Sequence, residues 1–238
     1  MNPVIDLMKS HSSVRRFKEE DIKEEDLRAI LTAGQMASSW KNFQSYSIIL
    51  VRSQEKKEAL YQFVPQEAIR QCSVFLLFVG DPNRAEKGVR MHTDQFHPEG
   101  PDNLLITSVD AALAGQNTLL AAESLGYGGV IIGLVRYQAS EVAKLFNLPD
   151  YTYPVFGMAL GVPNQNHPVK PRLPLEAVVF EESYQEQTPE VIEAFDQEQT
   201  AYAGARATDT WSQRLAAQFG QEEPAATAEL LKKHQLEK

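Results

Sequence analysis

The sequence predicts an α+β protein, because strand-like and helix-like apolar patterns alternate along its 238 residues. Residues 74–79 form the longest continuous apolar run, and its length and its valine and phenylalanine content are typical of a buried strand. Residues 103–125 instead place apolar and alanine side chains at the spacing of a long helix. An apolar share of 43% is ordinary for a globular protein and excludes a disordered chain.

The first part of the chain contains clear element boundaries. Asn2 followed by Pro3 predicts a helix start, with an N-cap and then proline at the first helical position. A second helix is expected from about residue 24, and Gly34 is expected to end it. The next predicted elements are a loop at residues 37–44, strands at 46–51 and 74–80, and a short helix near 55–63 between them.

Residues 81–102 mix glycine, proline, histidine and arginine with little periodicity, which predicts a long, lid-like excursion. The helix at 103–125, closed by Gly126, carries small residues that allow another helix to approach, either in the core or at a dimer interface. The remaining predicted elements are a strand at 129–135, a helix at 140–146, a strand at 154–161, an extended piece at 177–180 and helices from 189.

The tail from about residue 186 to 238 is polar and has too few apolar residues for a core of its own. We therefore expect it to pack on another chain or on the main domain, as an extension of a single domain that spans residues 1–238. The sequence contains no internal repeat and no low-complexity tract.

Charge and cysteine content exclude several classes of protein. With 23 Lys and Arg against 32 Asp and Glu, the net charge is −9, which disfavours binding to the nucleic-acid phosphate backbone. No continuous apolar run reaches the roughly 18 residues of a membrane span, and the N-terminus lacks the pattern of a signal peptide. The single cysteine, Cys72, permits no internal disulfide. We expect a cytoplasmic protein that binds neither nucleic acid nor membrane.

Familiar hydrolytic and metal motifs are absent from the sequence, as is the phosphate-binding P-loop. His92 and His97 lie five residues apart in the excursion, but a metal site needs three or four ligands, so no metal is expected. Cys72 stands beside a predicted buried strand, where an inert core thiol is expected.

A glycine-rich run at residues 126–133 has the wrong order for a dinucleotide fingerprint, because it leaves a helix and enters a strand. We interpret Gly126 as a helix C-cap. Gly133 is predicted to lie inside an apolar strand, where a glycine permits either close approach of a ligand or tight packing; both interpretations stay open.

Three basic or hydroxyl-rich groups remain, and they are the candidates for a binding site. They are His11, Ser13, Arg15 and Arg16; the loop at residues 37–42; and Lys170-Pro171-Arg172. Each group alone is better interpreted as a solvated surface, but arginine binds phosphate well through its paired donors. If the groups converge, they form a site for a phosphorylated ligand.

In order and spacing these groups resemble the nitroreductase family of flavin mononucleotide (FMN) enzymes, above all its NADPH nitroreductases and NADPH-flavin oxidoreductases. The specific parts are residues 11–15, 121–133 and 170–174, and the likeness extends from Pro3 to residues 209–212. The resemblance implies a mixed, mainly antiparallel sheet flanked by helices. It also implies an interlocked homodimer with FMN in two sites at the interface.

The resemblance also implies the cofactor contacts. His11, Ser13 and Arg15 would surround the FMN phosphate, ribityl chain and pyrimidine edge, and Lys170 and Arg172 would complete the phosphate site. The other implied flavin contacts are Ser38, Ser39, Gln66, Ile131, Ile132, Gly133 and Leu134, with a backbone N–H near flavin N5 from the last stretch. Arg206 would meet the extra phosphate of NADPH.

The implied activity is transfer of hydride from NADPH, or NADH, through flavin N5 to nitroaromatics, quinones or free flavin by a ping-pong mechanism. The cofactor carries this chemistry, so no catalytic side chain is assigned. The Gly133 N–H and Arg15 would favour the anionic reduced flavin.

Three departures from the family pattern stand out. Ser12 replaces an arginine that is usual in close relatives, and Trp40-Lys41-Asn42 interrupts a serine-rich loop. Arg206 is the only cation in residues 203–207, which predicts a modest preference for NADPH over NADH. The alternative hypothesis is a non-catalytic flavin-binding or partner-binding protein on the same scaffold.

Overall fold

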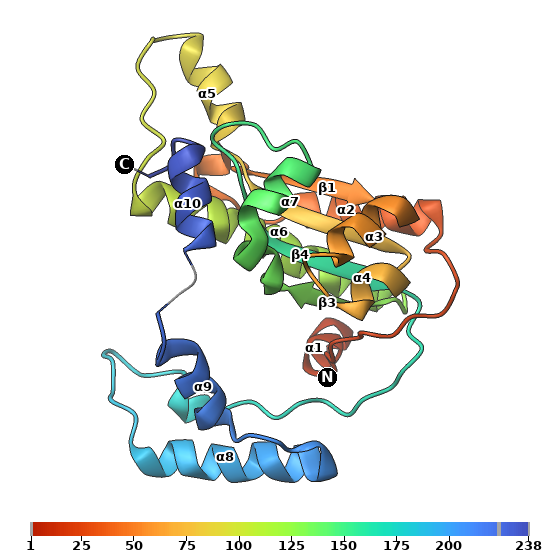
Figure 1. Cartoon of the computed structure of the whole chain (residues 1–238). Coiled ribbons are helices and arrows are strands. Elements are labelled where there is room, and N and C mark those ends of the chain that lie inside the picture. Colours follow the sequence, from red (N-terminus) through yellow and green to blue (C-terminus); the bar gives the residue numbers. More distant parts are fainter. Residues whose placement is uncertain (1, 223–224, 238) are drawn as a thin grey trace. The chain divides into compact units, whose positions relative to one another are not determined.

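Four strands form the sheet around which most of the chain folds (Figure 1). In the computed structural model they are β1 (Tyr46–Val51), β2 (Val74–Gly80), β3 (Gly128–Ile132) and β4 (Tyr153–Gly161). Their spatial order is β1-β2-β4-β3, and each neighbouring pair is antiparallel. The combination of this sheet with helices confirms the predicted α+β class.

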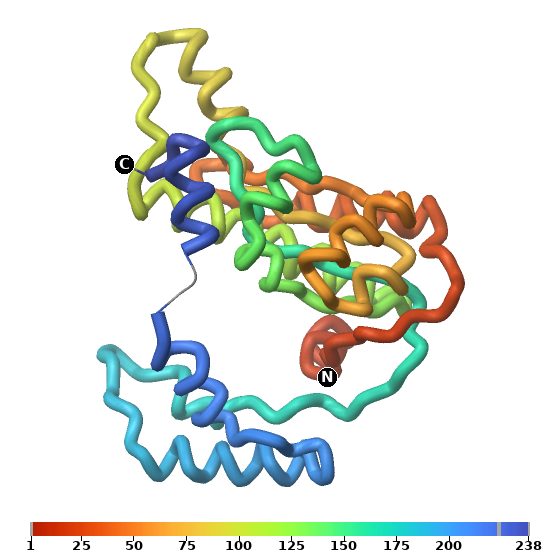
Figure 2. Tube along the Cα trace, viewed as in Figure 1, coloured from red at the N-terminus to blue at the C-terminus, as the bar shows by residue number. Residues whose placement is uncertain are grey.

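The structure describes residues 2–222 and 225–237, so residues 1, 223–224 and 238 of the predicted single domain lie outside it. Contacts divide the chain into a larger unit, Met1–Asn166 with Ala225–Lys238, and a smaller unit, His167–Pro224. Figure 2 follows the trace through both units.

Helices cover both faces of the sheet in the larger unit. Alternate residues of β2 face opposite sides, as the pleat of a strand requires, so Phe78 packs in one apolar cluster and Phe75 in the other. The helices are α1 (Pro3–Lys9), α2 (Glu24–Gln35), α3 (Gln54–Tyr61), α4 (Glu67–Gln71), α5 (Pro82–Arg90), α6 (Pro101–Ser124) and α7 (Ala139–Leu145). Residues of α2 and α6 contribute to the first cluster, and residues of α3, α4 and α7 to the second.

The prediction that Gly34 ends the second helix is wrong, because α2 continues to Gln35. Gly34 is instead the point where α2 meets α6. A Cβ atom at Gly34 would lie 2.1 Å from Thr118 Oγ1, so only a glycine lets the two backbones approach this closely. The expected close approach of another helix to α6 therefore occurs within the chain's own core.

Two short helices were not predicted. The excursion contains α5, whose N-cap Asp81 accepts a hydrogen bond from the Arg84 N–H, and α4 follows Gln66. Neither helix has the long apolar stripe that periodicity detects, since α4 has only five residues and α5 buries only Pro82. The predicted lid-like segment is therefore partly helical.

Two predicted extended pieces are also wrong in their bounds. The strand expected at 129–135 ends at Ile132, and Gly133–Gln138 forms a 3₁₀-helix, η2, so Gly133 follows the strand rather than lying inside it. The piece expected at 177–180 forms no strand; Leu175–Ala177 is a short 3₁₀-helix, η3. In both places apolar side chains continue after the regular element ends, so the apolar pattern predicts a longer strand than the structure contains.

The smaller unit is built on α8 (Pro189–Ala203) and α9 (Trp211–Phe219), with the 3₁₀-helix η4 (Gly204–Arg206) between them. The Phe195 and Trp211 rings meet edge to face at 5.2 Å, and the Asp196 carboxylate accepts from the Ser212 N–H and hydroxyl. The last helix, α10 (Ala226–Lys233), belongs to the larger unit, where Leu230 is buried in the core. This part of the tail packs on the main domain, one of the two places expected.

Among the described helices, α6 has the length and composition of a membrane span, with 24 residues and a mean hydropathy of 1.2 over its most apolar window. Of that window 39% is buried, and the helix packs on α2 and on strands of the sheet. Such a helix is also typical of the core of a globular protein.

Candidate functional site

Residues 11–15, the N-terminal motif segment, lie along the edge strand β3. The Val14 N–H donates to the Gly129 carbonyl over 2.9 Å, and a Cβ atom on Gly128 would lie 2.5 Å from Val14 Cγ2. Val14 is buried, whereas Ser13 is half-buried and Arg15 exposed. The segment is therefore held by its backbone and by one apolar side chain, with the polar neighbours available for a ligand.

His11 reaches the C-terminal end of α6. Its Nδ1 lies 2.5 Å from Oε1 of Glu123, which stands in the last turn of that helix. Both side chains are largely shielded, at 26% and 12% exposure. Residues 112 positions apart in the chain thus meet beside the motif segment.

The C-terminal end of β3 holds the next predicted contacts. Ile131 is 45% exposed on this edge strand, and Ile132 is 5% exposed in the core. A Cβ atom at Gly133 would lie 3.1 Å from the Arg136 guanidinium, which donates to the Val155 carbonyl over 2.8 Å. Packing against Arg136 therefore accounts for part of the need for glycine at this position, while Leu134 is half-buried.

Gln66 is exposed and serves as the N-cap residue of α4, between buried Val64 and Ala68. Val64 and Ala68 belong to the same apolar cluster as Val14 of the motif segment and Val130 of β3. The structure thus joins three predicted stretches, the motif segment, Gln66 and β3, through one shared core.

The serine loop, residues 38–45, is attached elsewhere. Its Trp40 and Ser45 N–H groups donate to the two carboxylate oxygens of Asp110, at 2.9 and 3.0 Å, and Asp110 is 1% exposed. Asp110 and Glu123 are separated by 13 positions of one helix (123 − 110), which is about 20 Å along its axis. Within one chain, Ser38 and Ser39 are therefore not brought to His11.

The predicted phosphate cations belong to the smaller unit, beside α8. The Gln199 amide donates to the Pro171 carbonyl and the Tyr202 hydroxyl to the Pro168 carbonyl, both over 2.9 Å. These bonds hold the backbone that carries Lys170 and Arg172, both exposed. Exposed Arg206 lies on the same unit, with its guanidinium 5.7 Å from the Tyr202 ring centre.

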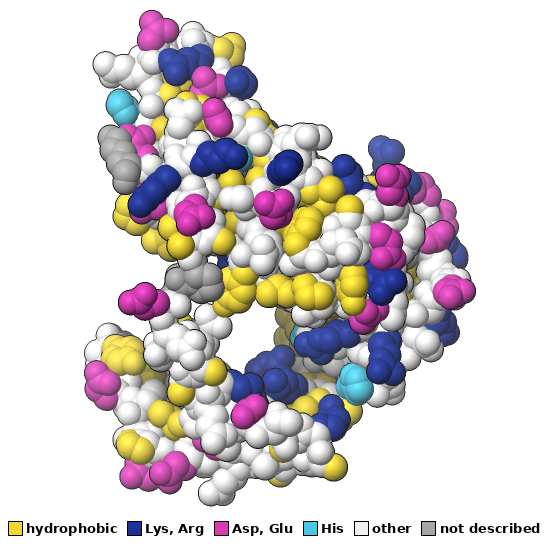
Figure 3. Space-filling model, in the orientation of Figure 1, with side chains coloured by type: hydrophobic (Ala, Val, Ile, Leu, Met, Phe, Trp, Pro, Cys, Tyr) yellow, Lys and Arg dark blue, Asp and Glu magenta, His cyan; other side chains and the backbone are white. Residues whose placement is uncertain are grey.

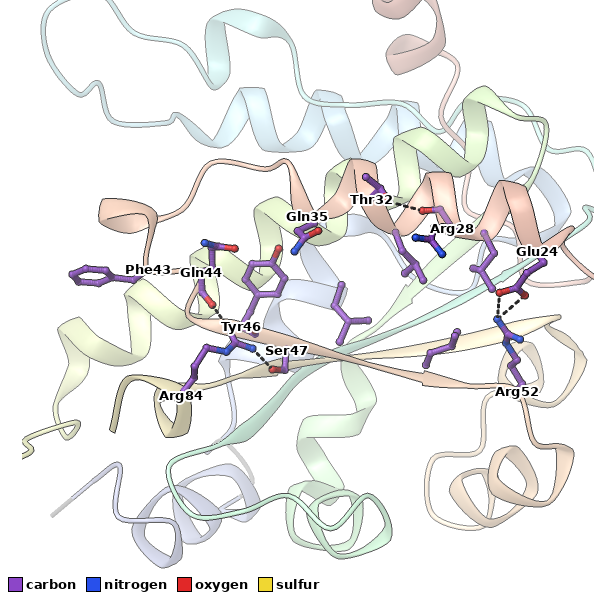
Figure 4. Close-up of a pocket in the computed structure, with 14 residues that line it drawn as sticks. Glu24, Arg28, Thr32, Gln35, Phe43, Gln44, Tyr46, Ser47, Arg52 and Arg84 are labelled. Atoms are coloured by element: carbon purple, nitrogen blue, oxygen red, sulfur yellow. Dashed lines mark hydrogen bonds and ion pairs between the residues drawn. The ribbon is translucent and has the colours of Figure 1, made fainter. Parts of the chain in front are cut away.

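A separate groove of about 740 Å³ lies between α2 and the edge strand β1 (Figure 4). Leu27 and Ile48 contribute apolar surface, and Arg52 pairs with Glu24 at 2.8 Å. Tyr46 also lines it; burial, with a smaller effect of the nearby Asp110 carboxylate, raises the pKa of this tyrosine. None of the predicted cofactor residues lines the groove.

The described residues contain no cluster of three or more histidine, cysteine or acidic side chains that could hold a metal. His97 lies 3.8 Å from Glu99. The excursion mixes charges of both signs, as the top of Figure 3 shows, and Glu86 pairs with both Lys87 and Arg90.

Comparison with known proteins shows to which family the chain belongs. The family model described as "Nitroreductase family" matches residues 8–162, and that of the "Nitroreductase family, C-terminal domain" matches residues 170–238. The chain belongs to the nitroreductase family. The resemblance inferred from the motifs is confirmed, and the gap between the two matches coincides with the start of the smaller unit at His167.

Individual nitroreductase-family relatives cover almost the whole chain. The NADPH-flavin oxidoreductase of Vibrio harveyi is 39% identical over 220 residues, or 90% of each protein. The oxygen-insensitive NADPH nitroreductase of Salmonella typhimurium is 36% identical over 224 residues, again 90% of each. The solved structure of the Vibrio harveyi NADPH:FMN oxidoreductase complexed with NAD+ superposes with a TM-score of 0.91 at 36% identity and covers 99% of both chains.

Two residues that support the predicted nitroreductase site were missed in the sequence. Glu123 and Asp110 both lie on α6, and the sequence around each contains a feature that indicates a need for a polar partner. A carboxylate in the last turn opposes the helix dipole, and an aspartate among alanines and leucines predicts a buried acid that needs partners. Such signals show that a partner is needed, but they do not say which residue it is.

Proposed function

We propose that the protein is an FMN-dependent oxidoreductase that takes electrons from NADPH and delivers them to small molecules such as nitroaromatics, quinones or free flavin. Relatives named NADPH-flavin oxidoreductase, oxygen-insensitive NADPH nitroreductase and FMN reductase [NAD(P)H] support the activity. The proposal depends on the docking of the motif segment on β3. This docking brings the hydrogen-bond donors Ser13 and Arg15 to the strand that exposes the apolar side chain of Ile131.

The donor set fits a flavin nucleotide. Ser13 offers a hydroxyl for the ribityl chain, and Arg15 offers paired cationic donors for the pyrimidine edge. Ile131 provides an exposed apolar surface of the kind on which a flat ring packs, and half-buried Gly133 follows it directly in the chain. His11, Gln66, Ile132 and Leu134 complete the set in the larger unit.

When bound, FMN supplies the ring that accepts a hydride and passes it on. The protein's residues bind and orient that ring and the substrates over it, so none of them has to form a covalent bond. Lys170 and Arg172 provide charge-assisted donors for the FMN phosphate, and Arg206 provides one for the 2′-phosphate of NADPH.

We infer that the protein works as a homodimer, because the described surface leaves a large apolar area exposed. On α6, Leu105, Val109 and Leu113 are four residues apart and 62%, 51% and 43% exposed. Exposed apolar side chains continue on α1, which contacts α6. Patches of this kind mark interfaces rather than free surface. A second copy also allows the serine loop of one chain to reach the flavin held by the other.

We propose that the two copies interlock through the edge strand β1, with an apolar segment of one copy packing beside β1 of the other. Val178 and Val179 of the smaller unit are 61% and 58% exposed in an apolar run followed by Glu181 and Glu182. The groove beside β1 offers an apolar floor with arginines, which complements such a segment from a second copy. Pairing there would cover an otherwise exposed strand edge.

We propose that the protein is cytoplasmic. A buried, unpaired Cys72 is in keeping with a reducing cytoplasm, and burial of α6 in a dimer is in keeping with a protein that does not enter a membrane.

The test is the identity and behaviour of the bound cofactor. The purified protein should be yellow, should release FMN on denaturation, and should oxidise NADPH faster when a quinone or nitroaromatic is added. A protein that binds FMN but never oxidises NADPH would instead support the non-catalytic alternative. A protein without affinity for FMN would contradict both.

A further inference from the structure

Glu123 contacts His11, one of the proposed FMN ligands, but is not itself one of those ligands. Its Oε1 lies 2.5 Å from Nδ1 of His11, and its side chain is only 12% exposed. The largely buried position strengthens the contact, since little water competes for the carboxylate.

The place of Glu123 in α6 is unfavourable by itself. The C-terminal end of a helix carries partial negative charge, so a carboxylate in the last turn is repelled by the unpaired carbonyls. The last turn of α6 has no basic residue that would offset this charge. A donor from another segment offsets it, and in the structure that donor is His11.

The contact assigns different roles to the two nitrogens of the imidazole. An ionised carboxylate only accepts hydrogen bonds, so with Glu123 in that form Nδ1 of His11 is the donor. Nε2 is then the ring nitrogen that can meet a ligand. The same division of roles is common where a carboxylate orients a histidine toward a metal or a substrate.

The backbone alone does not fix the ring. The nearest backbone hydrogen bond to the sheet is made by Val14, three residues after His11, and it does not involve the His11 side chain. Ser12 adds no positive charge beside it. The hydrogen bond that the structure gives the His11 ring is the one to Glu123.

We propose that Glu123 is the positioning residue for His11, holding the imidazole in its Nδ1–H form with Nε2 presented to the flavin nucleotide. The proposal rests on the proposed function, in which His11 is an FMN ligand. Glu123 itself does not touch the cofactor.

The test is a double-mutant cycle on FMN affinity, measured with apoprotein by quenching of FMN fluorescence. Glu123→Ala should raise the Kd about fivefold, as expected for the net value of one hydrogen bond. Glu123→Gln should stay within about twofold of wild type, because its amide oxygen still accepts from Nδ1–H. In a His11→Ala background, Glu123→Ala should cause no further loss.

Glu99→Ala is the matched control, since it removes a carboxylate 3.8 Å from another histidine, His97, and should leave the Kd unchanged. Thermal unfolding of each apoprotein shows whether the variant is folded. The proposal is overturned if Glu123→Gln binds as weakly as Glu123→Ala, or if Glu123→Ala weakens binding equally with and without His11. If the wild type binds no FMN, the proposed function is wrong. If the wild type binds FMN and Glu123→Ala binds it with the same Kd, only the proposal about Glu123 is wrong.

Discussion

Asp110 and Ser45 are 65 positions apart in the sequence, yet the Ser45 N–H donates to the Asp110 carboxylate over 3.0 Å. The other carboxylate oxygen accepts from Trp40. Between these two anchors, Lys41, Asn42 and Gln44 adopt positive φ angles of 47°, 59° and 52°. Non-glycine residues rarely take this conformation, so the buried carboxylate stabilises a loop that its own sequence disfavours.

Replacing Asp110 should therefore destabilise the fold as well as release the loop. Asp110→Ala leaves two backbone N–H groups without their acceptor, which costs about 2–4 kcal/mol of unfolding free energy. Urea denaturation measures this directly. Asp102→Ala, an exposed acid in the first turn of the same helix, should cost about 1 kcal/mol or less. Equal losses in the two variants would show that the contacts to the serine loop add nothing.

Gly34→Ala tests the contact between α2 and α6. The added Cβ would lie 2.1 Å from Thr118 Oγ1 and 3.3 Å from the Ala114 carbonyl oxygen, so the helices must separate. We expect a loss of roughly 1–3 kcal/mol in unfolding free energy, as is usual for overpacking.

Gly88→Ala is the opposite case on α5, where the added Cβ meets nothing within 4 Å. Alanine is the better helix former, so this variant should gain roughly 0.5–1 kcal/mol. Thermal melts of the two variants should move in opposite directions. A loss at Gly88 would mean that α5 is not a helix under the conditions of the measurement.

Lys170 and Arg172 are predicted to bind the FMN phosphate. The double substitution to alanine should weaken FMN binding at least tenfold, since a hydrogen bond to a charged group contributes roughly 1.5–3 kcal/mol. Riboflavin, which lacks the phosphate, should bind both proteins with equal affinity. Equal weakening for FMN and riboflavin would place these cations away from the phosphate.

Arg206→Ala tests the choice of nicotinamide cofactor. One exposed ion pair is typically worth about 1 kcal/mol or less, so the wild type should prefer NADPH over NADH by no more than about tenfold. The variant should show a raised KM for NADPH, an unchanged KM for NADH and normal FMN content. Loss of both activities together would exclude Arg206 as the reader of the 2′-phosphate.

Cys72 should be chemically inert in the folded protein. Burial, only partly offset by the Lys57 charge, raises the pKa of its thiol to about 12. The folded pKa lies above the ordinary thiol value of 9.0, so the stabilising contribution is complete below about pH 9 and is lost as the pH rises toward 12. At pH 8, a disulfide reagent should modify native protein far more slowly than unfolded protein. Rapid modification of the native state would contradict this burial.

Local patterns predicted most of the regular elements. The strand at Val74–Gly80 follows from a continuous apolar run of strand length, and the core of α6 follows from apolar and alanine side chains at helical spacing. The prediction failed where packing rather than propensity decides. Gly34 resembles a helix stop in sequence but is a contact between helices, and apolar residues after Ile132 continue into a 3₁₀-helix.

The site was predicted only as separate pieces. Motifs identified His11 and Lys170 as candidate ligands, but the partner of His11 lies 112 positions away, and no local signal connects the two. The contact between Asp110 and the serine loop likewise depends on how distant elements pack, and so does the groove at β1. The order of the strands in the sheet, β1-β2-β4-β3, could not be predicted from local patterns. Long-range pairing is the information that periodicity lacks.

An anaerobic titration of the purified, FMN-loaded protein with NADPH, followed by a quinone, tests the proposed activity most directly. NADPH should bleach the visible flavin absorbance in a one-to-one ratio to bound FMN, and the quinone should restore it without further protein or cofactor. A yellow protein whose absorbance stays unchanged when NADPH is added would contradict the proposed activity.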